Sequence, residues 1–190
     1  MSELKGNPRS SGYAPAEHGW YVEPGWAVDL LLQHERLTGR VWDPCCGGGT
    51  IPQACGRAGL LSVGSDIVDR NANYAVADFL GPLAPLKPLN VGVQHILTNP
   101  PFSEAAEIVE RGLALVPGKV IVLQRLAWLE GQKRRAFFER VGLSHVWVHS
   151  SRISMPPGGS DVPAIGGSQA FAWFVFARER SPMTTLGWLA

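Results

Sequence analysis

The sequence predicts an α/β fold in which a mostly parallel sheet carries helices on both faces. Two observations support this prediction. Apolar stretches of strand length alternate with stretches of helical periodicity between residues 25 and 177. One of the expected strands, residues 119–124, is a continuous apolar run, which is typical of a strand buried on both faces.

The elements follow one another in a regular order. The spacing of apolar residues predicts a first helix from Gly25 to about residues 38–39, and residues 41–42 begin the first strand. A glycine-rich turn at residues 43–50 leads into a short helix that closes at residues 56–59. Later strands are expected at 60–66, 72–76, 92–98, 119–124, 144–150 and 170–177, and later helices at 104–116 and 128–141.

Length and composition limit the protein class. The chain has 190 residues, 45% of them hydrophobic, which allows one core, and its net charge of +1 excludes a non-specific nucleic-acid coat protein. The three cysteines have neither the number of a disulfide framework nor the spacing of a zinc site. Neither a signal segment nor a membrane-spanning apolar run occurs, so we expect a cytoplasmic protein without metal or membrane partners. The oligomeric state stays open, with a monomer favoured.

We expect a single domain over residues 18–180. Residues 1–17 mix Ser, Gly, Pro and charged side chains, which predicts a flexible arm. Residues 152–168 form a Gly-, Pro- and Ser-rich connection longer than two strands need, which is typical of a functional loop. Residues 181–190 are expected to be a tail that docks on its own domain or on a partner.

The chemical prediction comes from four residues that follow an expected buried strand, Asn99-Pro100-Pro101-Phe102. The lone pair of a planar amino nitrogen is delocalised, and hydrogen-bond acceptors draw it toward sp³ geometry before it attacks a methyl group. The Asn99 side-chain oxygen and the Pro100 carbonyl can supply two such acceptors, in a wall that the prolines stiffen. The Phe102 ring offers a face to a planar base and tolerates positive charge. The pattern therefore predicts methylation of a planar amino group, and the alternative is a proline-rich strand exit without a chemical role.

Polar residues at the ends of earlier strands predict a cofactor site, because ligands of doubly wound sheets collect beyond the carboxyl ends of the strands. Glycines at 47–49 let the main chain approach a ligand, and the next helix directs its N–H groups at a carboxylate. Asp66 can accept hydrogen bonds from two ribose hydroxyls, and Ile67 can pack on an adenine. Asp78 can accept from the adenine amino group, with Phe79 stacking nearby. Taken singly, each acid also fits a cap or turn.

The glycine-rich turn leaves two questions. A dinucleotide-binding loop is disfavoured, because residues 50–52 stand where the third glycine of that fingerprint is needed. Cys45 and Cys46 fit two interpretations: small apolar residues that pack behind the turn, or a thiol of lowered pKa near a helix N-terminus that bound cofactor shields from alkylation.

In these motifs the chain resembles the S-adenosylmethionine-dependent amino-methyltransferases, and most of all the small DNA adenine-N6 methyltransferases of phages and prophages. The resemblance covers about residues 20–177. It implies a Rossmann-like methyltransferase fold with a mostly parallel seven-stranded sheet, an antiparallel last strand, and S-adenosylmethionine as cofactor. Asp43-Pro44-Cys45-Cys46-Gly47-Gly48-Gly49 resembles the family's D-P-x-x-G-x-G cofactor loop, and Asn99-Pro100-Pro101-Phe102 its catalytic motif.

The same resemblance implies further cofactor contacts. Asp66 corresponds to the ribose-binding acid, and Asp78-Phe79 to the adenine-binding pair. Tyr21-Val22-Glu23-Pro24 is similar to the family's Y-x-T-P element, which closes over the methionine end of the cofactor. Glu23 stands where the family commonly has Thr, and its carboxylate would repel the methionine carboxylate. It therefore faces the ammonium group or points away.

The expected reaction is direct methyl transfer from S-adenosylmethionine to the N6 of an adenine that is flipped out of DNA. Expected DNA contacts are the recognition loop 152–168 and five basic residues: Arg125, Lys133, Arg134, Arg135 and Arg152. A solvated helix face explains residues 133–135 equally well. Cytosine N4, an RNA base and a protein glutamine are alternative acceptors, and a non-catalytic nucleic-acid-binding module is the alternative of another class.

Overall fold

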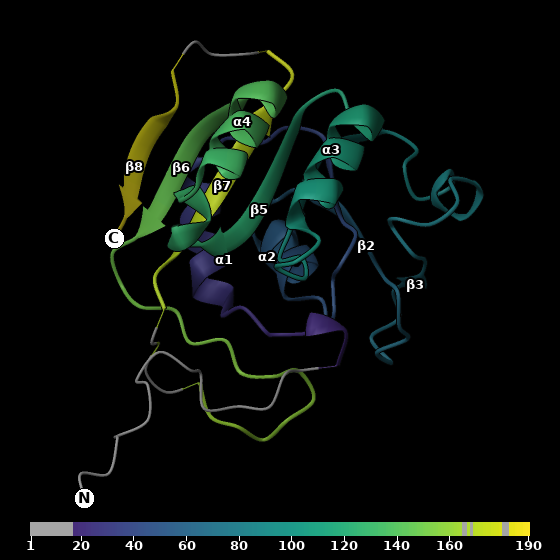
Figure 1. Cartoon of the computed structure of the whole chain (residues 1–190). Helices are drawn as coiled ribbons and strands as arrows, with labels where there is room; N and C mark the ends of the chain where they lie inside the picture. Colours follow the sequence, from purple (N-terminus) through teal and green to yellow (C-terminus); the bar gives the residue numbers. More distant parts are fainter. Residues whose placement is uncertain (1–16, 165–166, 168, 180–182) are drawn as a thin grey trace, which may run out of the picture.

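The computed structural model describes residues 17–164, 167, 169–179 and 183–190. Within these residues, eight strands form one sheet in the order β3-β2-β1-β4-β5-β7-β6-β8 (Figure 1). The expected N-terminal arm falls outside the described residues except for its last residue, and so do three positions of the loop 152–168 and the first two of the tail.

Five neighbouring strands of the sheet run parallel. β7 then runs antiparallel to both β5 and β6, and β8 lies parallel to β6. The strands are β1 (Arg40–Asp43), β2 (Leu61–Asp66), β3 (Ala75–Val76), β4 (Val93–Thr98), β5 (Lys119–Arg125), β6 (Leu143–His149), β7 (Phe171–Ala177) and β8 (Thr185–Leu189).

Helices cover both faces of the sheet, as the sequence predicts. α3 (Ala105–Leu115) and α4 (Gln132–Val141) cover the face turned to the viewer in Figure 1. α1 (Gly25–His34) and α2 (Thr50–Arg57) cover the other face. Alternate residues of β5 enter the two cores, because side chains of a strand point to opposite faces in turn. Three short 3₁₀ helices complete the fold: η1 (Glu17–Gly19), η2 (Ala84–Leu86) and η3 (Leu126–Leu129).

Three elements differ from the expected ones by more than one residue at a boundary. The helix expected at 128–141 is split into η3 and α4, because Gly131 adopts a φ of 101° at the start of α4. α1 ends at His34, since the backbone of Glu35 is extended and its side chain binds elsewhere. The strand expected at 72–76 shrinks to β3, because Asn73 has a φ of 59°, outside the extended region.

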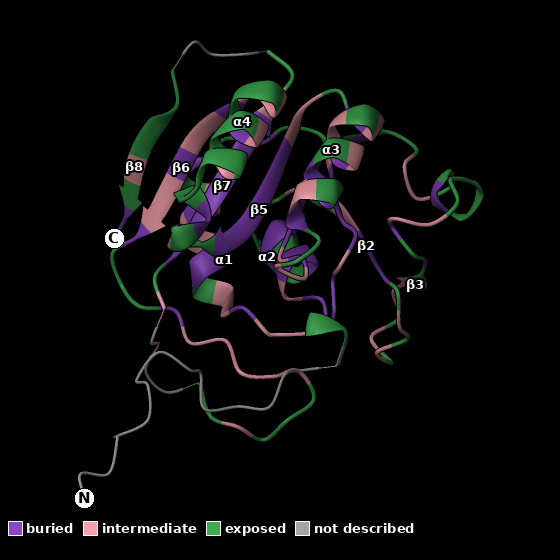
Figure 2. Ribbon diagram, viewed as in Figure 1, coloured by how far each residue is buried: buried purple, intermediate pink, exposed green. Residues whose placement is uncertain are grey.

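The expectation of seven strands is wrong by one, because part of the expected tail forms β8. This strand pairs with β6 and is mostly exposed at the edge of the sheet (Figure 2). Gly187 allows the pairing: a Cβ there would lie 2.4 Å from Cζ3 of Trp147. Leu189 is buried in the core beside α1 and α2, so residues 185–189 dock on their own sheet.

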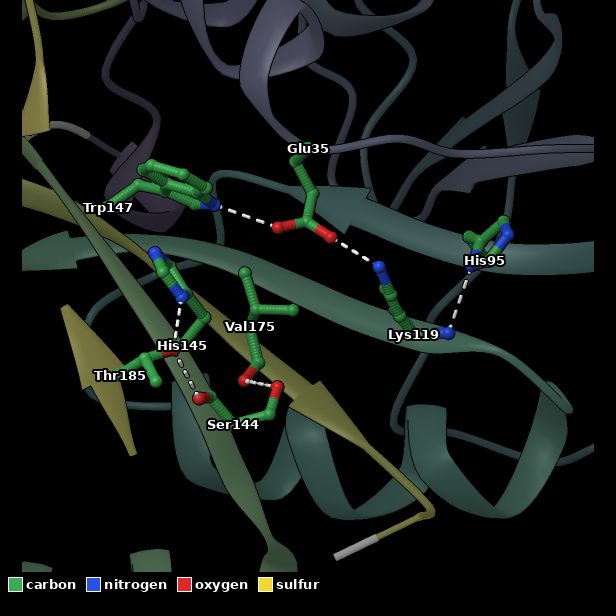
Figure 3. Close-up of polar contacts among 8 residues, drawn as sticks. All are labelled: Glu35, His95, Lys119, Ser144, His145, Trp147, Val175 and Thr185. Atoms are coloured by element: carbon green, nitrogen blue, oxygen red, sulfur yellow. Dashed lines mark hydrogen bonds and ion pairs between the residues drawn. The ribbon is translucent and has the colours of Figure 1, made fainter. Parts of the chain in front are cut away.

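A polar cluster ties α1, β4, β5, β6 and β8 together near the start of β5 (Figure 3). The Glu35 carboxylate forms an ion pair with Lys119 and accepts a hydrogen bond of 2.8 Å from Nε1 of Trp147. The backbone N–H of Lys119 donates to Nδ1 of His95 at 3.0 Å, and His145 contacts the Thr185 hydroxyl. The buried Glu35 carboxylate thus has both a cationic partner and a hydrogen-bond donor.

Across the described residues, no helix is both long and apolar enough to cross a membrane.

Candidate functional site

Strand register brings the predicted polar residues to one edge of the sheet. β1 ends at Asp43, β2 ends at Asp66, and Asn99 comes directly after the end of β4. These strands are neighbours in the order β2-β1-β4, and all three run parallel. Strand order reverses between β1 and β4, which is where open α/β sheets bind their ligands. The sheet therefore meets the geometric condition that the sequence prediction required.

One cavity at this edge is lined both by residues predicted to bind cofactor and by residues predicted to bind the methyl acceptor. The glycine-rich turn, the end of β2 and the 18–23 segment form its walls together with the residues after β4. The predicted site residues that line it are Tyr21, Glu23, Pro44, Cys45, Gly47, Asp66, Ile67, Asp78, Phe79, Asn99 and Pro101.

The remaining predicted residues of this site do not line the cavity: Pro24, Asp43, Gly49, Pro100 and Phe102. Asp43 lies behind the wall, where its Oδ1 accepts a hydrogen bond of 3.1 Å from the Cys45 N–H. Pro24 precedes α1, and its carbonyl accepts from the Ala27 N–H at 3.0 Å. These two residues shape the site without facing the cavity.

The glycine-rich turn has the positive φ angles that its sequence predicts. Gly47 has a φ of 50° and Gly49, which precedes α2, a φ of 88°. The space beside them is filled by side chains of this protein. A Cβ on Gly47 would lie 2.4 Å from Nε1 of Trp20, and a Cβ on Gly49 would lie 2.3 Å from the hydroxyl of Tyr74. Only Gly48, of the three, has nothing within 4 Å of the Cβ position.

The lowered-pKa interpretation of the adjacent cysteines is wrong. Burial and the negative charge of Asp43 raise the pKa of the Cys45 thiol well above its ordinary value. The same two causes raise the pKa of the Cys46 thiol. Burial disfavours a thiolate more than the nearby N-terminus of α2 favours it, so both side chains act as small apolar residues.

The side-chain amide of Asn99 is held in one orientation. Its Nδ2 donates hydrogen bonds of 2.9 Å to the Tyr21 carbonyl and of 2.9 Å to Oε2 of Glu23, and it lies 3.9 Å from Sδ of Met155. Two oxygen acceptors require an N–H₂ group at that end of the amide. The other end is therefore Oδ1, which accepts no hydrogen bond from a described residue.

The cavity is rich in buried acids. Glu23 is only 7% exposed, and burial raises its pKa to about 7, although the Asn99 and Thr50 side chains partly oppose this shift. Burial and the charge of Glu23 raise the pKa of Asp43 well above its ordinary value. One cationic side chain, Arg70, lies 3.6 Å from the Asp66 carboxylate. A cationic ligand would favour the ionised forms of these buried acids and pair with them, so the cavity favours a cationic ligand.

The residues predicted to bind adenosine differ in their free hydrogen-bonding positions and in their exposed apolar surface. Both oxygens of Asp66 already accept backbone hydrogen bonds, from the N–H of Gly47 at 2.9 Å and of Val68 at 3.0 Å. A carboxylate has about four acceptor positions, so ribose binding by Asp66 stays compatible with these bonds. Phe79 packs edge-on against Trp42 and is 3% exposed, whereas Ile67 is 51% exposed. Ile67 therefore presents the larger apolar surface.

The predicted nucleic-acid contacts lie outside the cavity, and the structure brings one of them to the catalytic motif. The Arg125 guanidinium lies 5.1 Å from the centre of the Phe102 ring, which also packs against Phe171. Lys133, Arg134 and Arg135 lie in the first turn of α4, where Arg134 stacks on Trp128 and Arg135 pairs with Glu139. Arg152 is exposed at the start of the loop 152–168.

Sequence reasoning missed two residues that shape the cavity, Trp20 and Arg70. The Arg70 guanidinium lies 4.2 Å from the centre of the Trp20 ring, and both side chains line the cavity. The available signals were weak: Trp20 directly precedes the Tyr-x-x-Pro element, and Arg70 follows Asp66 by four residues. Their contact joins positions 50 residues apart, so only the fold could reveal it.

A short backbone ladder connects the Tyr-x-x-Pro element with the loop 152–168. The N–H of Gly158 donates to the Trp20 carbonyl at 2.9 Å, and the N–H of Val22 donates to the Pro156 carbonyl at 3.0 Å. The Trp20 ring fits because residue 158 is glycine: a Cβ there would lie 2.1 Å from the indole. The expected recognition loop thus lies beside the cavity, and its Met155 reaches Asn99.

No protein-family model and no curated sequence matches this chain, but solved structures match its fold. A candidate RNA methyltransferase from Pyrococcus horikoshii is 14% identical, with a TM-score of 0.60 over 83% of this chain and 85% of that one. The magnesium protoporphyrin IX methyltransferase of Synechocystis, solved with bound S-adenosylmethionine, is 15% identical, with a TM-score of 0.50 over 83% and 79%. The chain has the fold of the S-adenosylmethionine-dependent methyltransferases.

A third structure with the methyltransferase fold is the modification subunit of a candidate type I restriction enzyme from Vibrio vulnificus. It is 15% identical, with a TM-score of 0.58 over 87% of this chain, which spans 45% of that protein. These neighbours agree with the prediction of S-adenosylmethionine as cofactor, and at such identities their likeness concerns the fold. Among the residues that the structure describes, no group of three or more His, Cys, Asp or Glu side chains is arranged to hold a metal ion.

Proposed function

We propose that this protein transfers the methyl group of S-adenosylmethionine to the exocyclic N6 of adenine in DNA, by direct attack of a flipped base. One observation carries the proposal: the predicted cofactor loop and Asn99 line the same cavity. A methyl group bound by the loop and an amino group bound at Asn99 would then meet without passing through solvent. Transfer of this kind needs the reacting atoms about 3–3.5 Å apart.

The charge of the cavity supports a sulfonium cofactor. S-adenosylmethionine carries a positive sulfonium and a positive ammonium group, and it supplies an electrophilic methyl group when bound. Asp66 would bind the ribose hydroxyls, with Ile67 against the adenine and Asp78 at its amino group. Glu23 and Asp43 lie buried beside the glycine-rich turn and complement the cationic end. The acid-rich wall is therefore compatible with this cofactor and unfavourable to a polyphosphate.

The acceptor side of the cavity supports an amino group as nucleophile. Asn99 Oδ1 would accept one N–H of the exocyclic amine, which draws its lone pair out of conjugation. The second acceptor would be the carbonyl of Pro100, which does not itself line the cavity but stands between the lining residues Asn99 and Pro101. The amine nitrogen would then form a bond to the methyl carbon as the sulfur–methyl bond breaks, with the electron pair left on sulfur. One amine proton would afterwards pass to solvent water, which restores the planar, neutral product. No covalent enzyme intermediate is needed.

The proposal of DNA as substrate has three supports. Arg125 lies over the Phe102 ring, next to the catalytic motif, so it offers a cation to the phosphate of a base flipped toward Asn99. The first turn of α4 follows the carboxyl end of β5, which directs its basic residues toward the same edge of the sheet. The Vibrio vulnificus neighbour is named as the modification subunit of a candidate type I restriction enzyme. We also propose that the loop 152–168 of a single domain, residues 18–180, recognises the target.

Product analysis tests the proposal. The protein is incubated with methyl-labelled S-adenosylmethionine and, separately, with double-stranded DNA, single-stranded DNA, RNA and a glutamine-containing peptide, and the nucleic acids are digested to nucleosides. We expect label in N6-methyldeoxyadenosine with the wild-type protein and none with the Asn99→Ala variant. Label in N4-methylcytosine, RNA or the peptide would contradict the proposed substrate. Cofactor binding without transfer to any acceptor would contradict the activity itself.

A further inference from the structure

Glu23 is a buried acid that so far has been assigned only to the cationic end of the cofactor, and its contact with Asn99 points to a second role. It belongs to the Tyr-x-x-Pro element, at a position where an acid is unexpected, and its Oε2 lies 2.9 Å from Nδ2 of Asn99. Only 7% of Glu23 is exposed. Among the described residues, no cationic side chain forms an ion pair with it. Besides Thr50, its side-chain partner is Asn99, the residue expected to hold the amino group of the substrate.

We infer that ionised Glu23 is a positioning residue that sets the orientation of the Asn99 amide, and that methyl transfer depends on its ionisation. This inference rests on the proposed function. Glu23 does not touch the substrate in this scheme, because it acts through Asn99. Its carboxylate holds the amide N–H₂ group on the side away from the bound substrate. Oδ1 is then free to accept an N–H of the substrate.

The physical basis is the difference between the two forms of a carboxyl group. An ionised carboxylate only accepts hydrogen bonds, so the amide must present its N–H₂ group. A protonated carboxyl both donates and accepts, and it would bind either end of the amide. The Tyr21 carbonyl still favours the observed orientation, but a neutral hydrogen bond holds it less strongly than a charge-assisted one. A flipped Asn99 would present donors to a substrate that is itself a donor.

The surroundings of Glu23 make its ionisation sensitive to pH near neutrality. Burial raises the pKa of Glu23 to about 7. Asp43 and Cys46 interact electrostatically with Glu23, and Asp43 is itself a buried acid of raised pKa. The other charged or titratable groups that line the cavity include His18, Asp66, Arg70, Asp78 and Glu104. Because several groups can titrate there, the test has to identify Glu23 by substitution.

Glu23→Gln is the decisive variant, because glutamine has the shape of glutamate and resembles its protonated form at every pH. We expect the wild-type rate, at saturating cofactor and DNA, to rise with pH and to reach half its maximum at or below about pH 7, because the cationic cofactor favours ionised Glu23. The variant should be about 10- to 100-fold slower than the wild type at pH 8.5, with no such rise. Its KM for DNA should change little, and saturating S-adenosylmethionine offsets the affinity lost when a negative charge beside the cationic cofactor is removed. The control is Glu107→Gln, which neutralises an exposed acid of α3 outside the cavity.

A second measurement works whether or not the protein methylates DNA. In ¹⁵N-labelled protein, the side-chain N–H₂ signals of Asn99 are assigned by their loss in Asn99→Ala and followed from pH 5.5 to 9. We expect them to shift with a midpoint near 7 in the wild type and in Glu107→Gln, but not in Glu23→Gln. Signals that do not titrate, or that titrate unchanged in Glu23→Gln, would overturn the inference. Absence of methyl transfer with titrating signals would instead refute the proposed function.

Discussion

Two buried glutamates, Glu23 and Glu35, occupy opposite kinds of surroundings in this protein. Each is 7% exposed. Glu35 forms an ion pair with Lys119 and accepts a hydrogen bond from Trp147 in the cluster of Figure 3. Glu23 lies in the cavity against the Asn99 amide, with the buried acid Asp43 as a neighbour and no cation paired to it among the described residues.

The difference indicates which region serves structure and which serves chemistry. Burying a charge is costly unless a partner of opposite charge compensates it. The Glu35 cluster meets this condition, so its removal should affect folding. The cavity leaves the cost uncompensated, which is typical of sites whose groups are arranged for a ligand or a reaction. Substitutions in the two regions should therefore separate effects on stability from effects on activity.

Asn99→Ala should have the largest effect on activity. It removes the amide oxygen that we expect to bind the amino group, and the loss of one such preorganised group typically costs about 10²- to 10³-fold in rate. Affinity for S-adenosylmethionine should change little, because the cofactor contacts lie elsewhere. Single-turnover kinetics and isothermal titration check the two parts. A methylation rate in this variant equal to that of the wild type would contradict the assignment of the catalytic motif.

Glu23→Gln should stabilise the protein in alkaline solution. The pKa of Glu23 is raised from 4.5 to about 7 in the folded state, so the folded protein binds the proton more tightly than the unfolded chain. Wild-type stability consequently falls as pH rises from about 4.5 to about 7, by about 3 kcal/mol in total. Urea unfolding at several pH values should show the variant gaining this amount above pH 7 and matching the wild type near pH 4.5. A pH-independent difference would contradict the burial argument.

Lys119→Met should have the reverse pattern. It leaves the Glu35 carboxylate buried without a cation, which for a fully buried pair costs about 3–5 kcal/mol. Because the Lys119 side chain is 34% exposed, we expect about 2 kcal/mol of lost stability. Methyl transfer well below the melting temperature should be unchanged. Chemical denaturation together with a rate measurement checks both. A variant of normal stability that methylates more slowly would contradict the separation of a structural region from a chemical one.

Lys133→Ala should have the smallest effect. If the exposed first turn of α4 contacts phosphate, the slope of log affinity for DNA against log salt should fall by about 1. Lys87→Ala, which removes an exposed lysine next to η2, is the matched control and should keep the parental slope. An unchanged slope in Lys133→Ala would contradict phosphate contact and favour the alternative, in which this turn of α4 is a solvated helix face.

The sequence predicted the sheet and the meeting of the site's two halves because both depend on local patterns. Alternating apolar strands and helices determine a parallel sheet, and residues at strand ends such as Asp43 and Asp66 must then share an edge. β8 was missed because the strand is only five residues long and mostly exposed. Its pairing also depends on Gly187, where a side chain would collide with the Trp147 ring. The Trp20–Arg70 contact and the Glu23–Asn99 hydrogen bond join positions far apart in the sequence, so no local pattern predicts them.

The position of the transferable methyl group relative to Asn99 tests the central claim most directly. A crystal structure of the protein with S-adenosylmethionine bound would measure the distance from the methyl carbon to Asn99 Oδ1. We expect about 6 Å or less, since the amine nitrogen must lie about 3 Å from each of them. A methyl group that points away from Asn99, or a cofactor bound outside this cavity, would contradict the account.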